Sequence, residues 1–200
     1  MMRTVLKLGG SLISVSKDLI NYLIEAQVDA LVVPGGGPFA ETVRRYTAHL
    51  DETAAHWMAV LAMNQYGFYM ADPKLAMIGD ISPLQKGISI FLPFKMLYKN
   101  DPLPHSWIVT SDSIAGWVAH QLNANLVIAT NVDGIVVNNQ LVSRIEAAEL
   151  MEETCVDAFL PHLLDMHNLD CTIVNGQNFQ RVYDAIQGHD TISTKIIGRK

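Results

Sequence analysis

The stretch Thr4-Val5-Leu6-Lys7-Leu8-Gly9-Gly10-Ser11 takes a short apolar run directly into a glycine-rich turn. A second turn of this kind, Pro34-Gly35-Gly36-Gly37-Pro38, follows the apolar residues 30–33. Each turn lies where a buried strand would lead into a helix, and there backbone N–H groups can hold phosphate oxygens. Glycine suits both turns because a Cβ would keep the backbone away from an anion and would disfavour positive φ. Two such turns, the first led by a lysine, indicate that a nucleotide phosphate is bound and attacked.

Apolar runs and amphipathic stretches alternate along the whole chain. This alternation predicts the α/β class: a three-layer α/β/α sandwich with a mainly parallel central sheet, covered by helices on both faces. We expect the functional site along the carboxyl ends of the strands, where both glycine turns begin. The predicted strands are 4–8, 30–33, 75–78, 88–92, 107–110, 126–130, 171–174 and 191–197, with a hairpin at 135–142. The predicted helices are 16–27, 38–50, 51–70, 113–122, 147–152, 156–166, with a kink at Pro161, and 179–186.

The composition is that of a globular protein, and we expect one domain over residues 1–200, because half of the residues are hydrophobic and 17% are charged. The net charge is −6, and no basic cluster exceeds a pair such as Arg44-Arg45, which disfavours a nucleic-acid partner. No apolar run reaches membrane-spanning length and no signal peptide precedes the first strand, so no membrane partner is expected.

The cysteines and histidines give no sign of a metal site. Cys155 and Cys171 have neither the spacing of metal ligands nor the density of a disulfide framework, and a reducing cytoplasm is the expected compartment. The seven histidines include no HxH or HxxxH pair, so a His-based metal site is not predicted.

The helix predicted at 51–70 is apolar on nearly all sides. Such a helix is either central to the fold or part of an oligomer contact. Trp57, Tyr66 and Tyr69 are residue types that often anchor interfaces, so we expect a homo-oligomer that assembles through this helix.

Three further motifs follow the two glycine turns in a fixed order: Thr110-Ser111-Asp112-Ser113-Ile114-Ala115, Thr130-Asn131-Val132-Asp133-Gly134 and Val174-Asn175-Gly176. Over nearly the whole chain, this order resembles the amino acid kinase superfamily. The resemblance implies an amino acid kinase fold and an ATP-dependent phosphotransferase. Neither a Walker A pattern nor GxGxxG is present, which disfavours the P-loop and Rossmann interpretations.

Lys7 and Asp112 are the predicted catalytic residues. Lys7 would neutralise charge that builds on the transferred phosphoryl group, whereas the alternative is a strand-edge lysine in solvent. The resemblance matches Asp112 to the aspartate that orients this lysine, whereas the alternative is a simple helix cap.

The resemblance also assigns the remaining motif residues. It implies that Gly9, Gly10 and Ser11 contact the β- and γ-phosphates, and that Gly35, Gly36 and Gly37 close over the transferred phosphate and the acceptor. Nucleotide contacts are implied for Thr130, Asn131, Val132, Asp133, Gly134, Asn175 and Gly176, with Asn131 in place of the family's first acid. On the acceptor side we place Ser111, and also Arg44 and Arg45 as holders of a phosphate, although a solvated helix face explains the two arginines equally well.

One departure from the family concerns a second lysine that several members carry late in the chain. Here no lysine lies between Lys99 and Lys195. Its charge must come from Mg²⁺, from His162 or from elsewhere, although a solvated surface position is the simpler interpretation of His162. The predicted cofactors are ATP and Mg²⁺.

The acceptor is the least specified part of the prediction. The Ser111–Ala115 motif, the run Cys155-Val156-Asp157 with Phe159-Leu160-Pro161, and the ending Val174-Asn175-Gly176-Gln177-Asn178 are similar to a small archaeal-type group, the aminomethylfuran-methyl phosphate kinases of methanofuran biosynthesis. This implies a small phosphomonoester as acceptor. The alternatives are another kinase of the superfamily (uridylate, isopentenyl phosphate or acetylglutamate) and a storage or regulatory protein that binds a nucleotide or oxyanion on the same fold.

Overall fold

The computed structural model describes residues 4–47, 49–72, 75–81, 86–150 and 154–199. Its centre is an eight-stranded sheet in the order β3-β4-β2-β1-β5-β9-β10-β8. All neighbouring strands pair in parallel except β9 and β10. The strands are β1 (Thr4–Leu8), β2 (Ala30–Pro34), β3 (Ala76–Ile78), β4 (Ile88–Phe91), β5 (Asn125–Thr130), β8 (Arg144–Glu146), β9 (Cys171–Asn175) and β10 (Ser193–Ile197).

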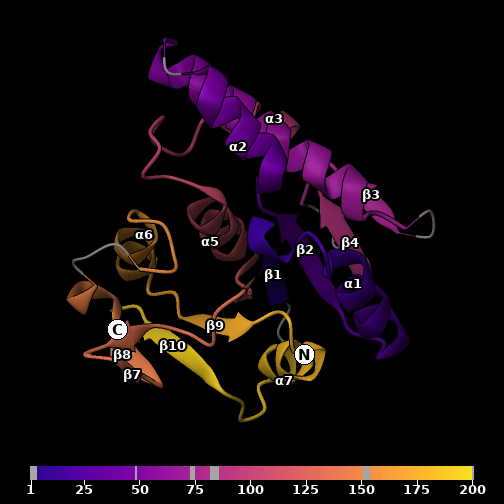
Figure 1. The fold of residues 1–200 in the computed structure, drawn as a ribbon, viewed down its shortest axis with the longest axis vertical. Helices are drawn as coiled ribbons and strands as arrows, with labels where there is room; N and C mark the ends of the chain where they lie inside the picture. The colour runs from indigo at the N-terminus through magenta and orange to yellow at the C-terminus, as the bar shows by residue number, and fades with distance from the viewer. Residues whose placement is uncertain (1–3, 48, 73–74, 82–85, 151–153, 200) are drawn as a thin grey trace.

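Helices cover both faces of this sheet (Figure 1). One hydrophobic cluster joins the sheet to α4 (Phe94–Asn100), α5 (Ser111–Leu122) and α6 (Leu160–His167). The cluster on the opposite face contains side chains of α1 (Ser16–Glu25) and α7 (Phe179–Gln187). Strands β1 and β2 are buried along their whole length, as expected when both faces of a parallel sheet are covered. The predicted three-layer α/β/α architecture is confirmed.

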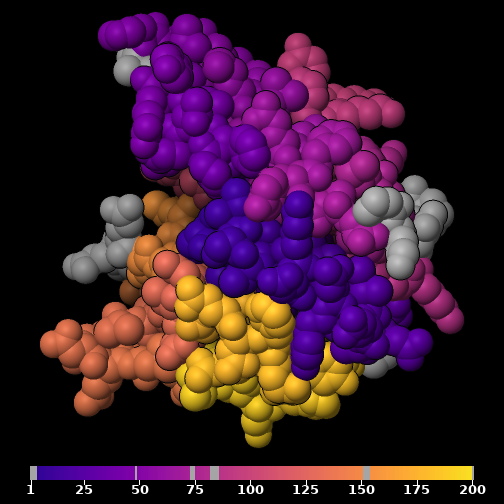
Figure 2. All heavy atoms as spheres, turned by 45° about the vertical axis from the view of Figure 1, so that its right-hand side comes forward, coloured from indigo at the N-terminus to yellow at the C-terminus, as the bar shows by residue number. Residues whose placement is uncertain are grey.

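Two adjacent helices, α2 (Gly37–Tyr46) and α3 (Glu52–Met70), cross one end of the sheet and lie side by side (Figures 1 and 2). The predicted start of α3 is confirmed, since the Asp51 carboxylate accepts a hydrogen bond from the Ala54 N–H at 2.9 Å. Helix α3 is apolar on most sides because it contributes to both clusters, with Val60 and Met63 in one and Tyr66 and Met70 in the other.

This packing corrects part of the interface prediction. Tyr66 is fully buried and cannot anchor an interface, whereas Trp57 is half-buried and packs edge-on against Phe94 and Tyr98 of the same chain. The exposed apolar side chains of α3 are Met58, Leu61, Phe68 and Tyr69.

Several local predictions were wrong. Residues 107–110 form turns and an irregular segment instead of a strand, and the short elements α4 and β8 were not predicted. Pro161 lies in the first turn of α6, where its missing N–H costs nothing, and it does not kink the helix. Residues 147–149 form a short 3-10 helix, η2, while residues 151–152 of the predicted helix lie outside the described part of the chain.

The predicted hairpin is confirmed as β6 (Val136–Val137) paired with β7 (Gln140–Leu141). Asn138 and Asn139 both adopt positive φ, which a tight two-residue turn requires. In the described part of the chain, no helix is both long enough and apolar enough to cross a membrane.

Candidate active site

The motifs singled out in the sequence converge on one edge of the sheet. Strands β2, β1, β5 and β9 are consecutive neighbours and run in parallel, so their carboxyl ends lie together. The two glycine turns follow β1 and β2, the Thr130–Gly134 motif follows β5, and Asn175-Gly176 follows β9. Loops and helix N-termini meet at such an edge, which is where open α/β sheets bind their ligands.

The two glycine turns contact each other directly. The Gly35 N–H donates to the Leu8 carbonyl at 2.7 Å, and a Cβ added to Gly10 would collide with Gly37. Gly37 also has φ +54°, a conformation that favours glycine. The two turns therefore lie side by side at one edge of the sheet, as a shared site requires.

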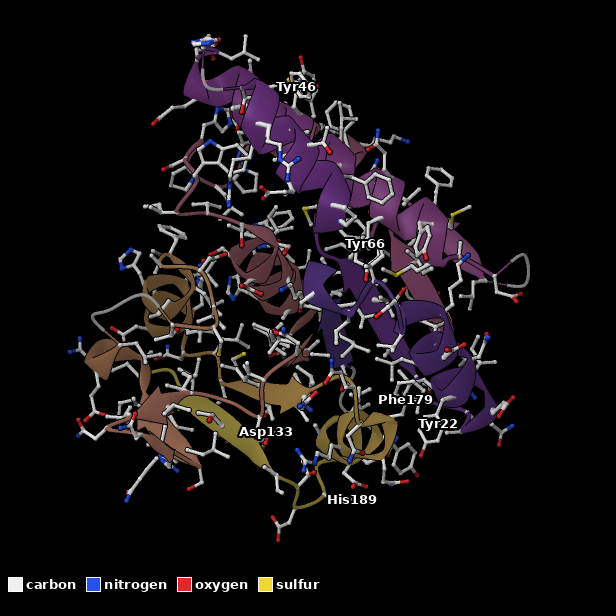
Figure 3. The ribbon with its side chains drawn as sticks, in the orientation of Figure 1. Tyr22, Tyr46, Tyr66, Asp133, Phe179 and His189 are labelled. Atoms are coloured by element: carbon white, nitrogen blue, oxygen red, sulfur yellow. The ribbon has the colours of Figure 1, made fainter. Side chains whose placement is uncertain are left out.

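Tyr66 of α3 contacts both glycine turns. Its hydroxyl donates to the Gly9 carbonyl at 3.3 Å, and its ring lies against Gly37. Burial raises the pKa of the Tyr66 hydroxyl to about 12, so it remains a donor. In Figure 3, Tyr66 lies where α2 and α3 meet the central strands.

Lys7 and Asp112 form a buried ion pair. The Lys7 Nζ and Asp112 Oδ1 are 2.7 Å apart, and the two side chains are only 9% and 7% exposed. Burial raises the pKa of the Asp112 carboxyl, and the nearby Lys7 charge counteracts that shift. Both simpler interpretations are wrong: Lys7 is not an edge lysine in solvent, and Asp112 is not the N-cap of α5, a position that Thr110 occupies.

Several helices begin at this edge of the sheet, among them the 3-10 helix η1 (Gly10–Leu12), α2 at Gly37 and α5 at Ser111. The first N–H groups of a helix have no partner within the helix and carry partial positive charge. Lys7 therefore lies among several groups that favour an anion, the arrangement expected around a phosphate.

Asp157, a residue to which sequence reasoning gave no role, contacts the ion pair through its backbone N–H. It lies just before α6, its N–H donates to Asp112 Oδ2 at 3.1 Å, and its side chain accepts hydrogen bonds from Thr110 and Ser113. The signal for this contact in the sequence was the pair of hydroxyl residues Thr110 and Ser113 at the start of α5, because both can donate to a carboxylate.

The motifs after β5 and β9 are joined to each other. The Gly176 N–H donates to the Thr130 carbonyl at 2.7 Å, and Asp133 Oδ1 accepts from the Asn175 side-chain amide at 3.0 Å. Arg181 of α7, which the sequence did not single out, lies 2.7 Å from the same Asp133 oxygen. These hydrogen bonds, that of Asn175 first, lower the pKa of Asp133. Asp133 lies beside α7 in Figure 3, and with Asn131 and Val132 it forms an exposed rim.

A pocket of about 240 Å³ opens next to the second glycine turn. Of the three residues assigned to the acceptor side outside that turn, Ser111 and Arg44 line it. Arg45 does not: it is largely exposed and lies 3.7 Å from Glu41. The full lining comprises Gly36, Gly37, Ala40, Glu41, Arg44, His56, Ala59, Val60, Met63, Trp107, Val109, Thr110, Ser111 and Ile114.

Aromatic contacts hold the polar side chains of this pocket in place. The Arg44 guanidinium lies 4.7 Å above the centre of the Trp107 ring. His56 stacks on His105, and burial together with the neighbouring His105 lowers the pKa of His56 to about 4. The polar lining thus includes the Arg44 cation, the acidic side chain of Glu41 and the neutral imidazole of His56. His162, considered in place of the missing lysine, is exposed on α6.

Comparison with known proteins agrees with this geometry. Residues 81–165 match the model of the amino acid kinase family. The chain is 32% identical over 215 aligned positions, covering 97% of each protein, to the [5-(aminomethyl)furan-3-yl]methyl phosphate kinase of Methanocaldococcus jannaschii. The chain belongs to the amino acid kinase family. It is accordingly a kinase, as the sequence predicted.

Solved structures of the family share the fold. Uridylate kinase from Archaeoglobus fulgidus superposes with a TM-score of 0.72 at 17% identity, over 98% of this chain and 100% of that one. UMP kinase from Ureaplasma parvum gives 0.67 at 16% identity, over 98% of both chains. UMP kinase from Bacillus anthracis gives 0.65 at 12% identity, over 100% of this chain and 97% of that one. At such low identity, this likeness concerns the amino acid kinase fold alone.

Proposed function

We propose that this kinase transfers the γ-phosphoryl group of ATP to a small phosphomonoester, such as an aminomethylfuran-methyl phosphate in methanofuran biosynthesis. An oxygen of the acceptor phosphate attacks the γ-phosphorus, the bond between that phosphorus and the bridging β,γ-oxygen breaks, and ADP leaves as the acceptor becomes a diphosphate. The observation that carries the proposal is the buried Lys7–Asp112 pair beside two touching glycine turns. The choice of acceptor rests on the named relative, which spans nearly the same length.

The nucleotide fits the carboxyl edge of the sheet. The N–H groups of Gly10 and Ser11 begin η1 and would hold the β- and γ-phosphates, and Lys7 would stabilise charge on the moving phosphoryl group. The rim formed by Asn131, Val132 and Asp133, together with the turn at Asn175-Gly176, would contact the nucleoside. Asp112 holds Lys7 in position for this role.

Mg²⁺ would enter with the nucleotide. Asp112 and Asp133 are the acidic residues of the predicted motifs, and both already have protein partners. Asp112 contacts Lys7 and the Asp157 N–H, and Asp133 contacts Asn175 and Arg181. We therefore assign the ion to the phosphate oxygens of ATP, where it would supply charge neutralisation during transfer.

The pocket beside Gly36 and Gly37 suits a small ring that carries a phosphate. Trp107 covers one face of the Arg44 guanidinium, which leaves the N–H groups along its edge free for a bidentate contact with a phosphate. Val60 and Met63 give the pocket apolar lining, and Ser111, the residue before Asp112, lines the same pocket. Arg45 is not part of this proposal, because it is exposed beside Glu41.

The purified enzyme with ATP and Mg²⁺ tests the proposal on a panel of acceptors: a furan-methyl phosphate, isopentenyl phosphate, UMP, acetylglutamate and carbamate. We expect the furan-methyl phosphate to give the highest kcat/KM. Fastest turnover of acetylglutamate or carbamate would contradict the phosphomonoester. No turnover of any acceptor, with ATP still bound, would favour the binding-protein alternative.

A pair of matched variants tests the acceptor site. Arg44→Ala is expected to raise KM for the acceptor about 10–100-fold, the loss typical of a charge-assisted hydrogen bond. Arg45→Ala, the same change one residue along α2, is expected to leave KM within about twofold, because exposed charges away from a site contribute little. Equal effects of the two variants would contradict the assignment to Arg44.

We also propose that the protein acts in the cytoplasm as a homo-oligomer that associates through α3. Met58, Leu61, Phe68 and Tyr69 leave apolar surface exposed along this helix. Light scattering at micromolar concentration should give a mass above that of one chain, and Leu61→Glu should lower it. The same change at the exposed Met166 of α6 should not. A monomeric wild-type mass would contradict self-association.

A further inference from the structure

We propose that Asp157 is a positioning residue that fixes the Lys7–Asp112 pair by tying the first turns of α5 and α6 to one carboxylate. This inference rests on the proposed function, because it gives the pair its role in phosphoryl transfer. Asp157 lies between the predicted motifs, and neither the glycine turns nor the acceptor pocket includes it.

The Asp157 carboxylate accepts hydrogen bonds from both neighbouring helix starts. Its Oδ2 accepts from the Thr110 N–H, the Thr110 hydroxyl and the Ser113 N–H, each at 2.9 Å. Its Oδ1 accepts from the Ser113 hydroxyl at 2.5 Å, the Leu160 N–H at 2.9 Å and the Phe159 N–H at 3.2 Å. The first three donors and the Ser113 hydroxyl belong to the start of α5, and the last two to the start of α6.

This set of contacts exceeds what a helix cap needs. A capping side chain ordinarily accepts one hydrogen bond from the second or third residue of its own helix. Asp157 caps α5 from a distance of 44 residues in sequence, through Ser113, and caps α6 at the same time. Thr110, the N-cap residue of α5 by position, makes no capping bond with its own side chain, and its hydroxyl donates to Asp157 instead.

The backbone of Asp157 acts on the catalytic pair itself. Its N–H donates to Asp112 Oδ2 at 3.1 Å, while the other oxygen of Asp112 faces Lys7 at 2.7 Å. The side chain of Asp157 therefore fixes the helix that carries Asp112, and its backbone fixes the rotation of the Asp112 carboxylate. Together they determine where Lys7 can place its charge.

Such positioning matters because the pair is almost completely buried. A buried carboxylate that loses its partners is expected to take up a proton or turn away, since the interior solvates charge poorly. A displacement of about 1 Å near reacting atoms can reduce the rate as much as 10²-fold. The Asp157 charge itself is offset by the positive ends of the two helices that donate to it.

Asp157→Asn tests this inference. Both oxygens of the Asp157 carboxylate accept hydrogen bonds, so the NH2 group of asparagine would face hydrogen-bond donors in either orientation of the amide. We expect kcat to fall about 10–100-fold while KM for ATP stays within about threefold, the pattern of misplaced catalytic groups. The control is Asp51→Asn, the same change at the start of α3, where Asp51 accepts one bond from Ala54. This control should leave kcat unchanged at temperatures well below its unfolding transition.

Ser113→Ala covers the case in which Asp157→Asn fails to fold. It removes only the hydroxyl bond to Asp157 Oδ1 and keeps the backbone donor. A two- to fivefold lower kcat with unchanged KM for ATP is expected, roughly the loss of one hydrogen bond. Wild-type kcat in Asp157→Asn, or in Ser113→Ala where the first variant does not fold, would mean that Asp157 is only a structural cap.

A crystal structure separates this inference from the proposed function. If the wild-type protein turns over no acceptor, the proposed function fails, and the geometry of the variant still decides the role of Asp157. In Asp157→Asn we expect Lys7 and Asp112 to lie beyond hydrogen-bonding distance, and in Ser113→Ala, if that variant is needed, we expect a smaller but measurable lengthening of the same separation. A pair that remains as close as in the wild type, at 2.7 Å, would overturn the proposal.

Discussion

Two ion pairs lie at the same edge of the sheet, with the same separation and opposite surroundings. Lys7 and Asp112 are 2.7 Å apart, as are Arg181 and Asp133. The first pair is 9% and 7% exposed, whereas the second is 23% and 47% exposed. The separations are equal, but water reaches the charges of the second pair and is largely excluded from those of the first.

The two carboxyl groups respond to these surroundings in opposite directions. Burial raises the pKa of Asp112, against the effect of Lys7, whereas hydrogen bonds from Asn175 and Arg181 lower the pKa of the exposed Asp133. Burying two charges carries a desolvation penalty that their attraction often fails to repay, so a buried pair is weak evidence for stability. We infer that the first pair is kept for chemistry and that the second orients a loop at the nucleotide rim.

The largest expected effect comes from breaking the buried pair at its lysine. Lys7→Ala should lower kcat about 10²–10³-fold, the loss for one positioned electrostatic group, while the fold persists because Asp112 can take up a proton. The control is Lys195→Ala, which removes an exposed lysine paired with Asp170 at 3.1 Å. Circular dichroism checks the fold, and near wild-type turnover in Lys7→Ala would remove Lys7 from the mechanism.

Asp112→Asn should have the next largest effect. Asparagine retains an oxygen for the Asp157 N–H but loses the charge that holds Lys7, so kcat should fall about 10–100-fold with a smaller change in ATP affinity. In the wild type, the acid limb of kcat should lie above the ordinary aspartate pKa of about 3.9, because burial raises the pKa of Asp112. Full activity with reduced stability in Asp112→Asn would instead assign the residue a structural role.

Breaking the exposed pair should have a modest effect. Arg181→Ala leaves Asp133 with the Asn175 amide as its remaining partner. We expect KM for ATP to rise about two- to fivefold with kcat within twofold, in keeping with the small contribution of exposed pairs. The difference from wild type should shrink at high salt, because ions screen exposed charges. Arg144→Ala, which removes another exposed pair with Glu146, is the control. A large loss of kcat in Arg181→Ala would place that residue nearer the chemistry.

The smallest expected effect is an opposite dependence of stability on pH. Asp133 has a lowered pKa in the folded state, so its contribution is present above the unfolded pKa and is lost as the pH falls through the folded pKa. Asp112 has a raised pKa, so its contribution is present below the unfolded pKa and is lost as the pH rises through the folded pKa.

Urea unfolding between pH 3 and pH 7 measures this difference. The free energy of unfolding of wild type minus Asp133→Asn should increase with pH, whereas wild type minus Asp112→Asn should decrease. Slopes of the same sign would mean that the contrast between the buried and the exposed pair does not extend to folding.

Local sequence specified the parts of the site that follow directly from a strand. Lys7 lies within a buried strand that is followed by glycines, and Thr130 and Asn175 end neighbouring strands. Parallel pairing of these strands is enough to bring the turns after them together. The acceptor pocket could not be located in this way, because α2, α3 and the segment before α5 each supply part of its wall. Arg44 and Arg45 are indistinguishable in sequence, and only the rotation of α2 separates the one that stacks on Trp107 from the one in solvent.

By itself, the sequence determined the α/β class and the place of the glycine turns after buried strands, which follow from periodicity and from the geometry of parallel strands. The prediction that Lys7 and Asp112 belong to one site came from the resemblance to the amino acid kinases. Only the tertiary structure decided that Tyr66 contacts the glycine turns and that Asp157 caps two helices beside the Lys7–Asp112 pair. Contacts between residues far apart in sequence leave no local pattern, because the partner of a buried polar group is chosen by packing.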